Sequence, residues 1–378
     1  MRNFELETYF SKWEFSARYH MTASDTESIT IGELYGLAGM SPDSLLDLHL
    51  GYTETWGAPD LRQAISETYE NMAPENILCF AGAEEGVYAA MRVLLTKDDH
   101  AIVVVPNYQA AETLPLDICS VSGVGLKSDP QWHLDLDELR NAMQPNTKLI
   151  SVCFPNNPTG HIIPHQDYQM LIDMCRENDV YLFCDEVYRG VELDATKRID
   201  QAADIYEKAL SLNVMSKAYG LPGLRIGWIA SADKELLSKI EKYKHYLSIC
   251  NSAPSERLAV IALGVRKKLL NRSRSLMREN VEKLDIFFEN YPDLFEWHHP
   301  DGSCIGFPRF MGRGGVEAFC KDLVEENGVL LLPASIYKSE LMAAPNDRFR
   351  IGFGRSNIDA GITAMQEFID RKYNKLRP

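Results

Sequence analysis

The sequence predicts an α/β fold, with a large α/β/α domain around a mostly parallel sheet and a second, smaller α+β domain. In the middle of the chain, short β-branched runs alternate with longer amphipathic stretches, a pattern typical of βαβ units. A long charged stretch with helical spacing runs from Lys234 to about Phe288, and after Phe295 the pattern returns to short strands and turns. With 378 residues, 45% of them hydrophobic, the chain can form two domains. We expect the large domain at 45–275 and the small one at 1–44 plus 276–378.

Each element of this fold corresponds to a segment of the sequence. The predicted strands of the large sheet are apolar runs: Ile77–Phe80, Ala101–Val105, Leu149–Phe154, Val180–Cys184, Leu212–Met215 and Ile226–Ala230. The predicted helices between them have amphipathic spacing: Glu85–Thr96, Gln166–Glu177 and Gln201–Ala209. Pro254 interrupts the long charged stretch and should begin or bend a helix there. In the smaller domain, strands are expected at Cys304–Pro308, Val329–Leu332 and Arg348–Gly352.

The charge balance argues against two classes of partner. The chain has 39 basic and 54 acidic residues, a formal net charge of −15. Such a surface repels phosphate backbones and anionic lipid, so we expect neither nucleic acid nor membrane as a partner. An acidic protein can still hold a positive pocket, so the net charge says nothing about the substrate.

The cysteines and the N-terminus favour the cytoplasm. None of the eight cysteines forms a C-x-x-C pair, and Cys79, Cys153 and Cys184 lie inside apolar runs, which favours buried free thiols. The first seven residues have acids where a secretory signal needs a basic start and an apolar stretch. We expect no metal site, since the nine histidines lack a His-Glu-x-x-His pattern.

Several motifs follow the proposed strands, at the sheet edge where an open α/β sheet binds its ligand. Gly82, Ala83 and Glu84 open a helix, where backbone N–H groups can bind an anion, although a plain strand-to-helix turn would use the same residues. Tyr108 could stack on a planar ring, or it could pack on its own domain. Asn157, in the Pro155–Gly160 loop, offers a neutral donor.

The next two motifs carry ionisable groups. Asp185 ends a buried strand, where a carboxylate is unfavourable unless paired, although it could also cap the following turn. Tyr188 lies three residues on and could face the same ligand. Lys217 follows another apolar strand, in a glycine-punctuated loop that makes it a candidate Schiff-base nucleophile. Arg225, eight residues later, could pair with a phosphate through its planar fork.

Together these motifs resemble the class I/II aminotransferases, pyridoxal-phosphate enzymes with the aspartate aminotransferase fold (fold type I). The resemblance runs from about Tyr52 to Arg350, and its most specific parts are Asn-Pro-Thr-Gly at 157–160, Asp185-x-x-Tyr188 and Ser216-Lys-x-x-Gly-Leu-x-Gly-x-Arg225. It implies pyridoxal 5′-phosphate as cofactor and transfer of an amino group between an amino acid and a 2-oxo acid. Lys217 would form the internal aldimine and then move the α-proton.

The resemblance also implies roles for the other candidates. Asp185 would pair with the pyridine nitrogen, Asn157 and Tyr188 would bind the ring 3′-oxygen, and Tyr108 would stack on the ring. The phosphate would be held by these residues: Gly82, Ala83, Glu84, Ser216 and Arg225. Arg350, together with Asn157, would bind the substrate carboxylate. Val214 stands where many members have Ser or Thr, so one phosphate hydrogen bond must be missing or supplied elsewhere.

Two further implications concern assembly and reaction type. Gly51-Tyr52-Thr53 matches the segment whose tyrosine reaches the phosphate of the neighbouring subunit, which implies a homodimer with shared active sites. Phe4–Tyr35 and Asn251–Glu256 are similar to the capreomycidine-synthase-like group, which implies a lyase or cyclase acting by elimination as the alternative. Both reactions use the same motifs, so the motifs do not choose between them. A non-catalytic regulator built on this fold is disfavoured by the acidic chain.

Overall fold

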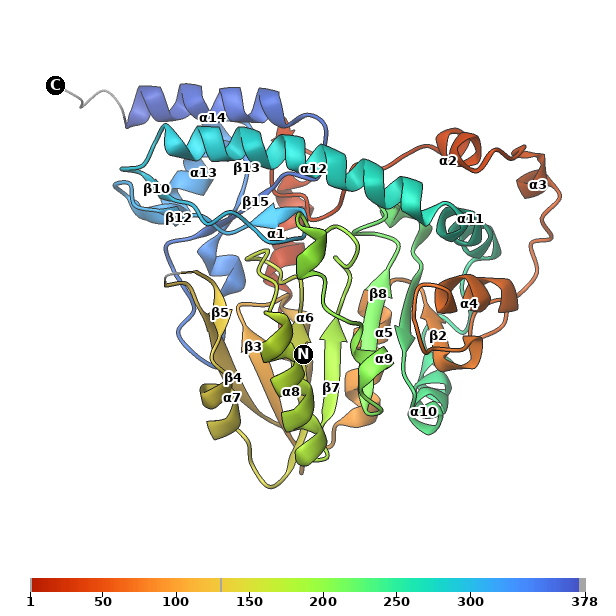
Figure 1. Ribbon diagram of the computed structural model, residues 1–378. Helices are drawn as coiled ribbons and strands as arrows, with labels where there is room; N and C mark the ends of the chain where they lie inside the picture. Colours follow the sequence, from red (N-terminus) through yellow and green to blue (C-terminus); the bar gives the residue numbers. More distant parts are fainter. Residues whose placement is uncertain (1, 130, 374–378) are drawn as a thin grey trace.

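The computed structural model describes residues 2–129 and 131–373, and its centre is an eight-stranded sheet flanked by helices (Figure 1). The strands lie in the order β2-β9-β8-β7-β6-β3-β4-β5. Their bounds are β2 (Ile77–Phe80), β3 (His100–Val105), β4 (Ser120–Lys127), β5 (His133–Leu134), β6 (Thr147–Cys153), β7 (Tyr181–Asp185), β8 (Ala209–Val214) and β9 (Gly227–Ala230). The adjacent strands β4, β3, β6, β7 and β8 pair in parallel. Strand β9 is antiparallel to β2 and β8, and β5 is antiparallel to β4. The predicted mostly parallel sheet is therefore confirmed.

The predicted strands of this sheet all overlap observed ones, and the differences have physical causes. Strand β4 was not predicted because glycines interrupt its apolar pattern. A Cβ at Gly123 would lie 2.7 Å from Leu341 Cβ, so close packing of the 341–342 segment favours glycine there, and Gly125 contacts the terminal methyl group of Met342. The predicted helix Gln201–Ala209 is wrong in length, because only Ala202–Ile205 is helical and the fully buried β8 already begins at Ala209.

The predicted helices at 85–96 and 166–177 correspond to α5 and α8, and further helices that were not predicted also flank the sheet. Their bounds are α4 (Pro59–Ser66), α5 (Ala83–Leu94), α6 (Ala110–Leu116), α7 (Leu136–Asn141), α8 (His165–Glu177), α9 (Ala202–Ile205), α10 (Lys234–Lys244), α11 (Ala253–Gly264) and α12 (Arg266–Glu289). The long charged stretch is thus three helices, with Pro254 in the first turn of α11. In Figure 1, α12 spans the molecule above the sheet and joins α11 to the C-terminal elements. The predicted domain boundary at residue 275 falls inside α12, and the division into domains stays a prediction.

The C-terminal elements form small sheets covered by helices. Their bounds are β10 (Phe295–Glu296), β11 (Ile305–Gly306), β12 (Arg309–Phe310), α13 (Gly315–Asn327), β13 (Val329–Leu330), β14 (Leu332–Pro333), β15 (Phe349–Gly352) and α14 (Ile358–Lys372). The N-terminal arm contributes α1 (Glu5–Trp13) and β1 (Tyr19–His20), followed by α2 (Ile31–Ala38) and α3 (Asp43–Leu46). Strand β1 pairs in parallel with β13, so the beginning of the chain is joined to its end.

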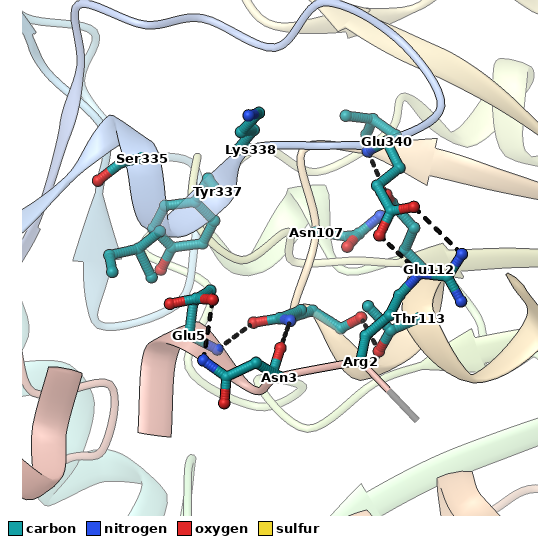
Figure 2. A pocket seen from close by; sticks show the side chains of 13 residues that line it. Arg2, Asn3, Glu5, Asn107, Glu112, Thr113, Ser335, Tyr337, Lys338 and Glu340 are labelled. Carbon is teal, nitrogen blue, oxygen red and sulfur yellow. Dashed lines mark hydrogen bonds and ion pairs between the residues drawn. The ribbon is translucent and has the colours of Figure 1, made fainter. Parts of the chain in front are cut away.

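The first residues of the chain are fixed to two other segments. Figure 2 shows Arg2, Asn3 and Glu5 on one side of a cavity of about 490 Å³, with Lys338 and Glu340 near it. Arg2 Nε donates to Glu340 Oε1 at 2.6 Å, and its Nη1 donates to Asp117 Oδ1 at 2.6 Å. These contacts hold the start of α1 at the sheet edge. In the part of the chain that the structure describes, no helix is long and apolar enough to cross a membrane.

Candidate active site

A cavity of about 530 Å³ opens where β6, β7 and β8 end. Nine of the residues predicted from the sequence line it: Ala83, Glu84, Tyr108, Asn157, Asp185, Tyr188, Ser216, Lys217 and Arg225. Gly82 is the residue before Ala83, and Arg350 donates a hydrogen bond to Asn157. Tyr52 lies elsewhere on the surface. The structure therefore brings together residues that are far apart in the sequence: Ala83 and Arg225 are separated by 142 positions.

One end of the cavity is shaped to receive an anion. Helix α5 begins here with Gly82 as its N-cap at a φ of 96°, and no side chain caps its first N–H groups. A Cβ at Gly82 would lie 2.4 Å from Arg225 Nη2, and a Cβ at Gly227 would lie 2.7 Å from Ala83 N. Glycine at both positions lets the guanidinium and the free N–H groups converge, which is the arrangement that binds phosphate. Arg225 Nη1 also donates to Ser216 Oγ at 3.4 Å.

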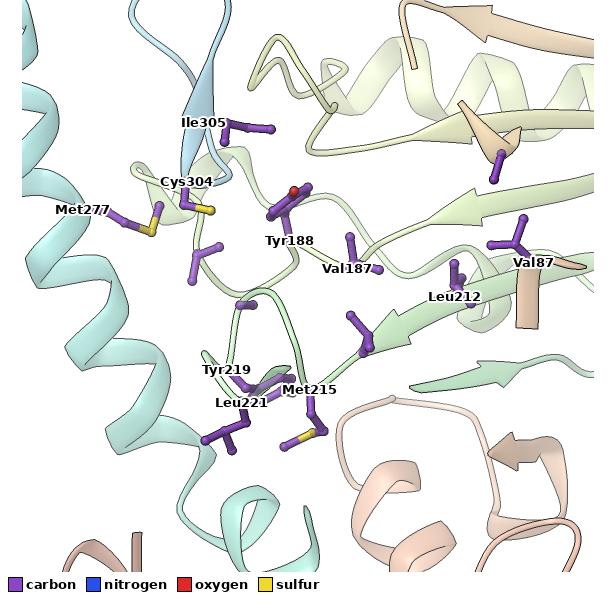
Figure 3. Packing of buried hydrophobic residues seen from close by; sticks show 14 of the residues in the cluster. Val87, Val187, Tyr188, Leu212, Met215, Tyr219, Leu221, Met277, Cys304 and Ile305 are labelled. Atoms are coloured by element: carbon purple, nitrogen blue, oxygen red, sulfur yellow. The ribbon is translucent and has the colours of Figure 1, made fainter. Parts of the chain in front are cut away.

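Lys217 follows β8 and reaches into the cavity. Its Nζ donates a hydrogen bond to Ser24 Oγ at 2.9 Å. Burial lowers the pKa of Lys217, which favours the neutral, nucleophilic amine. Figure 3 shows the loop that carries it, with Met215, Tyr219 and Leu221 turned into the buried cluster. This packing fixes the backbone of the lysine loop.

Asp185 ends β7 on the same side of the sheet. Burial raises the pKa of Asp185 to about 6, although the N–H of Val187 and the charge of Lys217 act in the opposite direction. Val187 N donates to Asp185 Oδ1 at 3.1 Å, so this carboxylate caps the following turn and also faces the cavity. A buried carboxylate of this kind is stabilised by a cationic ligand.

The predicted aromatic and amide contacts lie around the same cavity. Tyr108 packs edge-on against Phe4, with ring centroids 5.4 Å apart, and donates its hydroxyl to Glu7 Oε1 at 3.4 Å. Tyr188 is buried and donates its hydroxyl to the backbone oxygen of Ser24 at 3.2 Å.

Arg350 is buried, with 1% of its surface exposed, and its hydrogen bonds go to neutral groups. Its guanidinium donates to Tyr337 Oη at 2.9 Å, to the backbone oxygen of Thr22 at 2.7 Å and to Asn157 Oδ1 at 3.5 Å. Within residues 2–129 and 131–373, no ion pair to Arg350 is found. A buried cation that lacks a carboxylate partner favours binding of an anion.

The mouth of the cavity contains residues that the sequence motifs did not single out as site residues. Glu7, Glu14 and Asp25 line it from the N-terminal arm, and Arg355 lines it from the loop after β15. Arg355 Nη2 pairs with Asp25 Oδ1 at 2.9 Å. Arg355 comes five residues after Arg350 in the Phe-Arg-Ile-Gly-Phe-Gly-Arg-Ser run, and this closeness was the only signal for it in the sequence.

Tyr52 is 93% exposed and does not line the cavity of its own chain. Leu46 and Leu50, a few residues before it in the chain, are also exposed, as is Tyr246. Thr53 Oγ1 donates to the backbone oxygen of Asn251 at 3.1 Å, which joins the two segments that carry these side chains.

A lysine, an aspartate and an uncapped helix start at the carboxyl edge of a mostly parallel sheet define the class: pyridoxal-phosphate enzymes with the aspartate aminotransferase fold. Residues 48–364 match the family described as aminotransferase class I and II, and the chain belongs to this family. It is a pyridoxal-phosphate-dependent aminotransferase, which transfers an amino group between an amino acid and a 2-oxo acid.

Individual relatives cover nearly the whole chain. Capreomycidine synthase of Streptomyces vinaceus is 26% identical over 371 residues, 96% of this chain and 92% of the relative. An aspartate aminotransferase of Sulfurisphaera tokodaii is 25% identical over 85% of this chain and 82% of its own length. Among solved structures, a PLP-dependent aminotransferase from Streptococcus suis has a TM-score of 0.92 at 28% identity, and the PLP-dependent cyclase OrfR has 0.90 at 22%. Both cover 98% of each chain.

Proposed function

We propose that this aminotransferase takes its amino group from an amino acid with a positively charged side chain. The observation that carries the proposal is the excess of carboxylates at the cavity mouth. The proposal also assigns residues to the cofactor and to the substrate carboxylate. The charged residues that remain unassigned are the ones that can bind the substrate side chain.

The cofactor would use most of the cations of the cavity. Its phosphate fits the start of α5 beside Arg225, and Lys217 would hold its aldehyde carbon covalently. Asp185 would pair with its ring nitrogen, with Tyr108 on one ring face and Asn157 and Tyr188 near the ring oxygen. When bound, the cofactor supplies an electron sink for negative charge at the substrate α-carbon. Lys217 would take the proton from that carbon, because its lowered pKa favours the neutral amine.

Three of the carboxylates that line the cavity remain without an ion pair to Lys or Arg in the part of the chain that the structure describes: Glu7, Glu14 and Glu84. Asp25, in contrast, is neutralised by Arg355. The nearest candidate for Glu14 is His20, at 4.0 Å, and burial with the charges of Arg355 and Arg350 lowers the pKa of His20 to about 4. Burial and the charge on Glu7 raise the pKa of Glu14. A cationic side chain between these two carboxylates would relieve their repulsion.

The test compares arginine with citrulline, which has nearly the same shape without the charge. We expect arginine to have the higher kcat/KM, by roughly 10- to 100-fold, since hydrogen bonds to charged groups contribute about 1.5–3 kcal/mol. The double substitution Glu7→Gln and Glu14→Gln should remove most of that preference. Equal kcat/KM values for the two compounds would exclude a cationic substrate, while transamination of other amino acids would leave the enzyme class intact.

A second expected result concerns Arg350. Its fork would hold the substrate α-carboxylate through two parallel hydrogen bonds, which a lysine cannot supply. Arg350→Lys should keep the cofactor and lose roughly 2–5 kcal/mol of substrate binding. Measuring Tm and kcat/KM on one preparation decides between this role and a structural one. A lower Tm with unchanged kcat/KM would mean that Arg350 only braces Thr22 and Tyr337.

We also propose a homodimer in which Tyr52 reaches the cofactor phosphate of the other subunit. The exposure of Leu46, Leu50, Tyr52 and Tyr246, on two segments joined by the hydrogen bond from Thr53 to Asn251, supports this, since exposed apolar surface often marks protein interfaces. The free thiols of all eight cysteines support a reducing, cytoplasmic location.

The dimer predicts complementation between two inactive variants. Lys217→Ala and Tyr52→Ala subunits should each be impaired alone. Mixing them should restore part of the activity, because one of the two sites in each hybrid has both an intact lysine and an intact tyrosine. Full activity of a monomer in sedimentation would contradict the shared site.

A second candidate function is cyclisation of an amino acid. The observations that favour it are the relative named capreomycidine synthase and the fold neighbour titled a PLP-dependent cyclase. The two functions differ when an amino donor is added without a 2-oxo acid acceptor. An aminotransferase releases one equivalent of 2-oxo acid per subunit, whereas a cyclase turns over repeatedly and releases none.

A further inference from the structure

A short segment of the N-terminal arm, Thr22–Thr26, contacts three cations of the site: Arg350, Arg355 and Lys217. The backbone oxygen of Thr22 accepts from Arg350 at 2.7 Å, and Asp25 pairs with Arg355. Ser24 Oγ accepts from Lys217 Nζ at 2.9 Å, and Thr26 Oγ1 donates to the backbone oxygen of Lys217 at 3.0 Å. We call this segment the strap.

The strap has little room to move. A Cβ at Gly352 would lie 2.3 Å from the backbone oxygen of Ala23, and one at Gly354 would lie 2.4 Å from that of Asp25. On the lysine side, a Cβ at Gly220 would lie 2.8 Å from Thr26 Oγ1. The three glycines therefore allow neighbouring segments to pack closely against the strap on two sides. This packing fixes the position of Ser24 in the strap.

From this geometry we infer that Ser24 is a positioning residue for Lys217. Its hydroxyl holds the amine whenever Nζ is not bonded to the cofactor. By accepting one N–H, it directs the nitrogen lone pair away from the strap and toward the cavity. The proton leaves the substrate α-carbon for that lone pair, the C–H electron pair stays with the substrate, and the resulting ammonium later gives up the same proton. The inference rests on the proposed role of Lys217.

The position of the serine hydroxyl explains why this role falls to Ser24. The hydroxyl of Tyr188 also lies beside the strap, but it donates to the backbone oxygen of Ser24. Ser24 thus joins two of the predicted site residues, and its side chain is left to the lysine. The hydrogen bond from Lys217 to Ser24 can affect catalysis only in steps where the amine is not bonded to the cofactor. We therefore expect its effect on the rate of proton transfer.

The test uses Ser24→Ala, with Ser24→Thr to restore a hydroxyl and Ser28→Ala as a matched control on an exposed serine of the same arm. In single turnovers, Ser24→Ala should slow proton transfer roughly 3- to 30-fold, the range for loss of one hydrogen bond to an ionisable group. The isotope effect from an α-deuterated substrate should rise, KM should change little, and Ser24→Thr should recover part of the rate.

A second measurement does not depend on turnover. In cofactor-free protein, the rate of covalent attachment of pyridoxal 5′-phosphate against pH reports when Lys217 is neutral. Removing an acceptor of the ammonium N–H disfavours the charged form, so the profile of Ser24→Ala should shift to lower pH. An unchanged profile with an unchanged isotope effect would overturn the inference, as would a fall in Tm that accounts for the whole rate loss. Failure of the proposed function would appear separately, as cofactor attachment to a lysine other than Lys217.

Discussion

Replacing Lys217 with alanine is expected to abolish both covalent cofactor attachment and turnover. We propose that this amine bonds the cofactor and moves the α-proton, and in the cavity no other lysine is among the lining residues described. The purified wild-type protein should be yellow, and Lys217→Ala should lack the absorbance of the covalently bound cofactor.

Lys244 serves as the comparison residue for this experiment, because among the lysines of residues 2–129 and 131–373 it is the second one whose pKa is lowered. Burial also lowers the pKa of Lys244, but its Nζ donates to the backbone oxygen of Thr55 at 2.6 Å, outside the cavity. Borohydride reduction followed by peptide mapping should place the cofactor on Lys217. Finding the label on Lys244 would show that a lowered pKa alone, and not position in the cavity, selects the lysine.

Asp185→Asn is expected to retain cofactor and to lose activity by roughly 10²- to 10⁴-fold. The amide keeps the shape of the carboxylate but cannot stabilise a protonated ring nitrogen, so charge at the substrate α-carbon is stabilised less in the transition state. Single-turnover rates and cofactor content, measured together, separate loss of chemistry from loss of binding. Near-normal turnover would mean that the ring nitrogen does not need a charged partner.

The neighbouring Glu186 gives a matched control for Asp185→Asn. Burial also raises the pKa of Glu186, to about 7, but its carboxylate accepts from Ser211 Oγ at 2.9 Å and from Ala202 N at 2.8 Å. It does not line the cavity. Glu186→Gln should therefore keep turnover while it lowers Tm, which would show that removing a buried charge from this strand end is not enough to stop catalysis.

The sequence predicted those parts of the fold and site that lie in single local patterns. Strands such as β2 and β3 are almost entirely apolar, and Asp185 and Lys217 follow apolar runs, while Arg225 precedes one. Strand β4 was missed because its glycines pack against Leu341 and Met342, more than two hundred residues away, which no local pattern records.

The same reason explains why Ser24 was missed, and why Asp25 could be interpreted equally well as part of a substrate entrance or as part of a solvated loop. Ser24 contacts Lys217 across 193 positions of sequence, and Asp25 contacts Arg355 across 330. A serine or an acid in a polar arm has no local feature that distinguishes a ligand from a solvated side chain. Arg350 could be assigned from its motif, but its burial and its neutral partners became visible only in three dimensions.

The pairing of β1 with β13 has a consequence for how the enzyme is made. Strand β1 is translated 310 residues before its partner strand, since Tyr19 pairs with Val329. Until then the large sheet can fold as a unit, but the nascent arm has no edge to pair with, and Ser24 has no fixed place beside Lys217. The strap therefore takes its place beside Lys217 only after β13 has been synthesised, so cofactor attachment in the geometry described here should follow synthesis of β13.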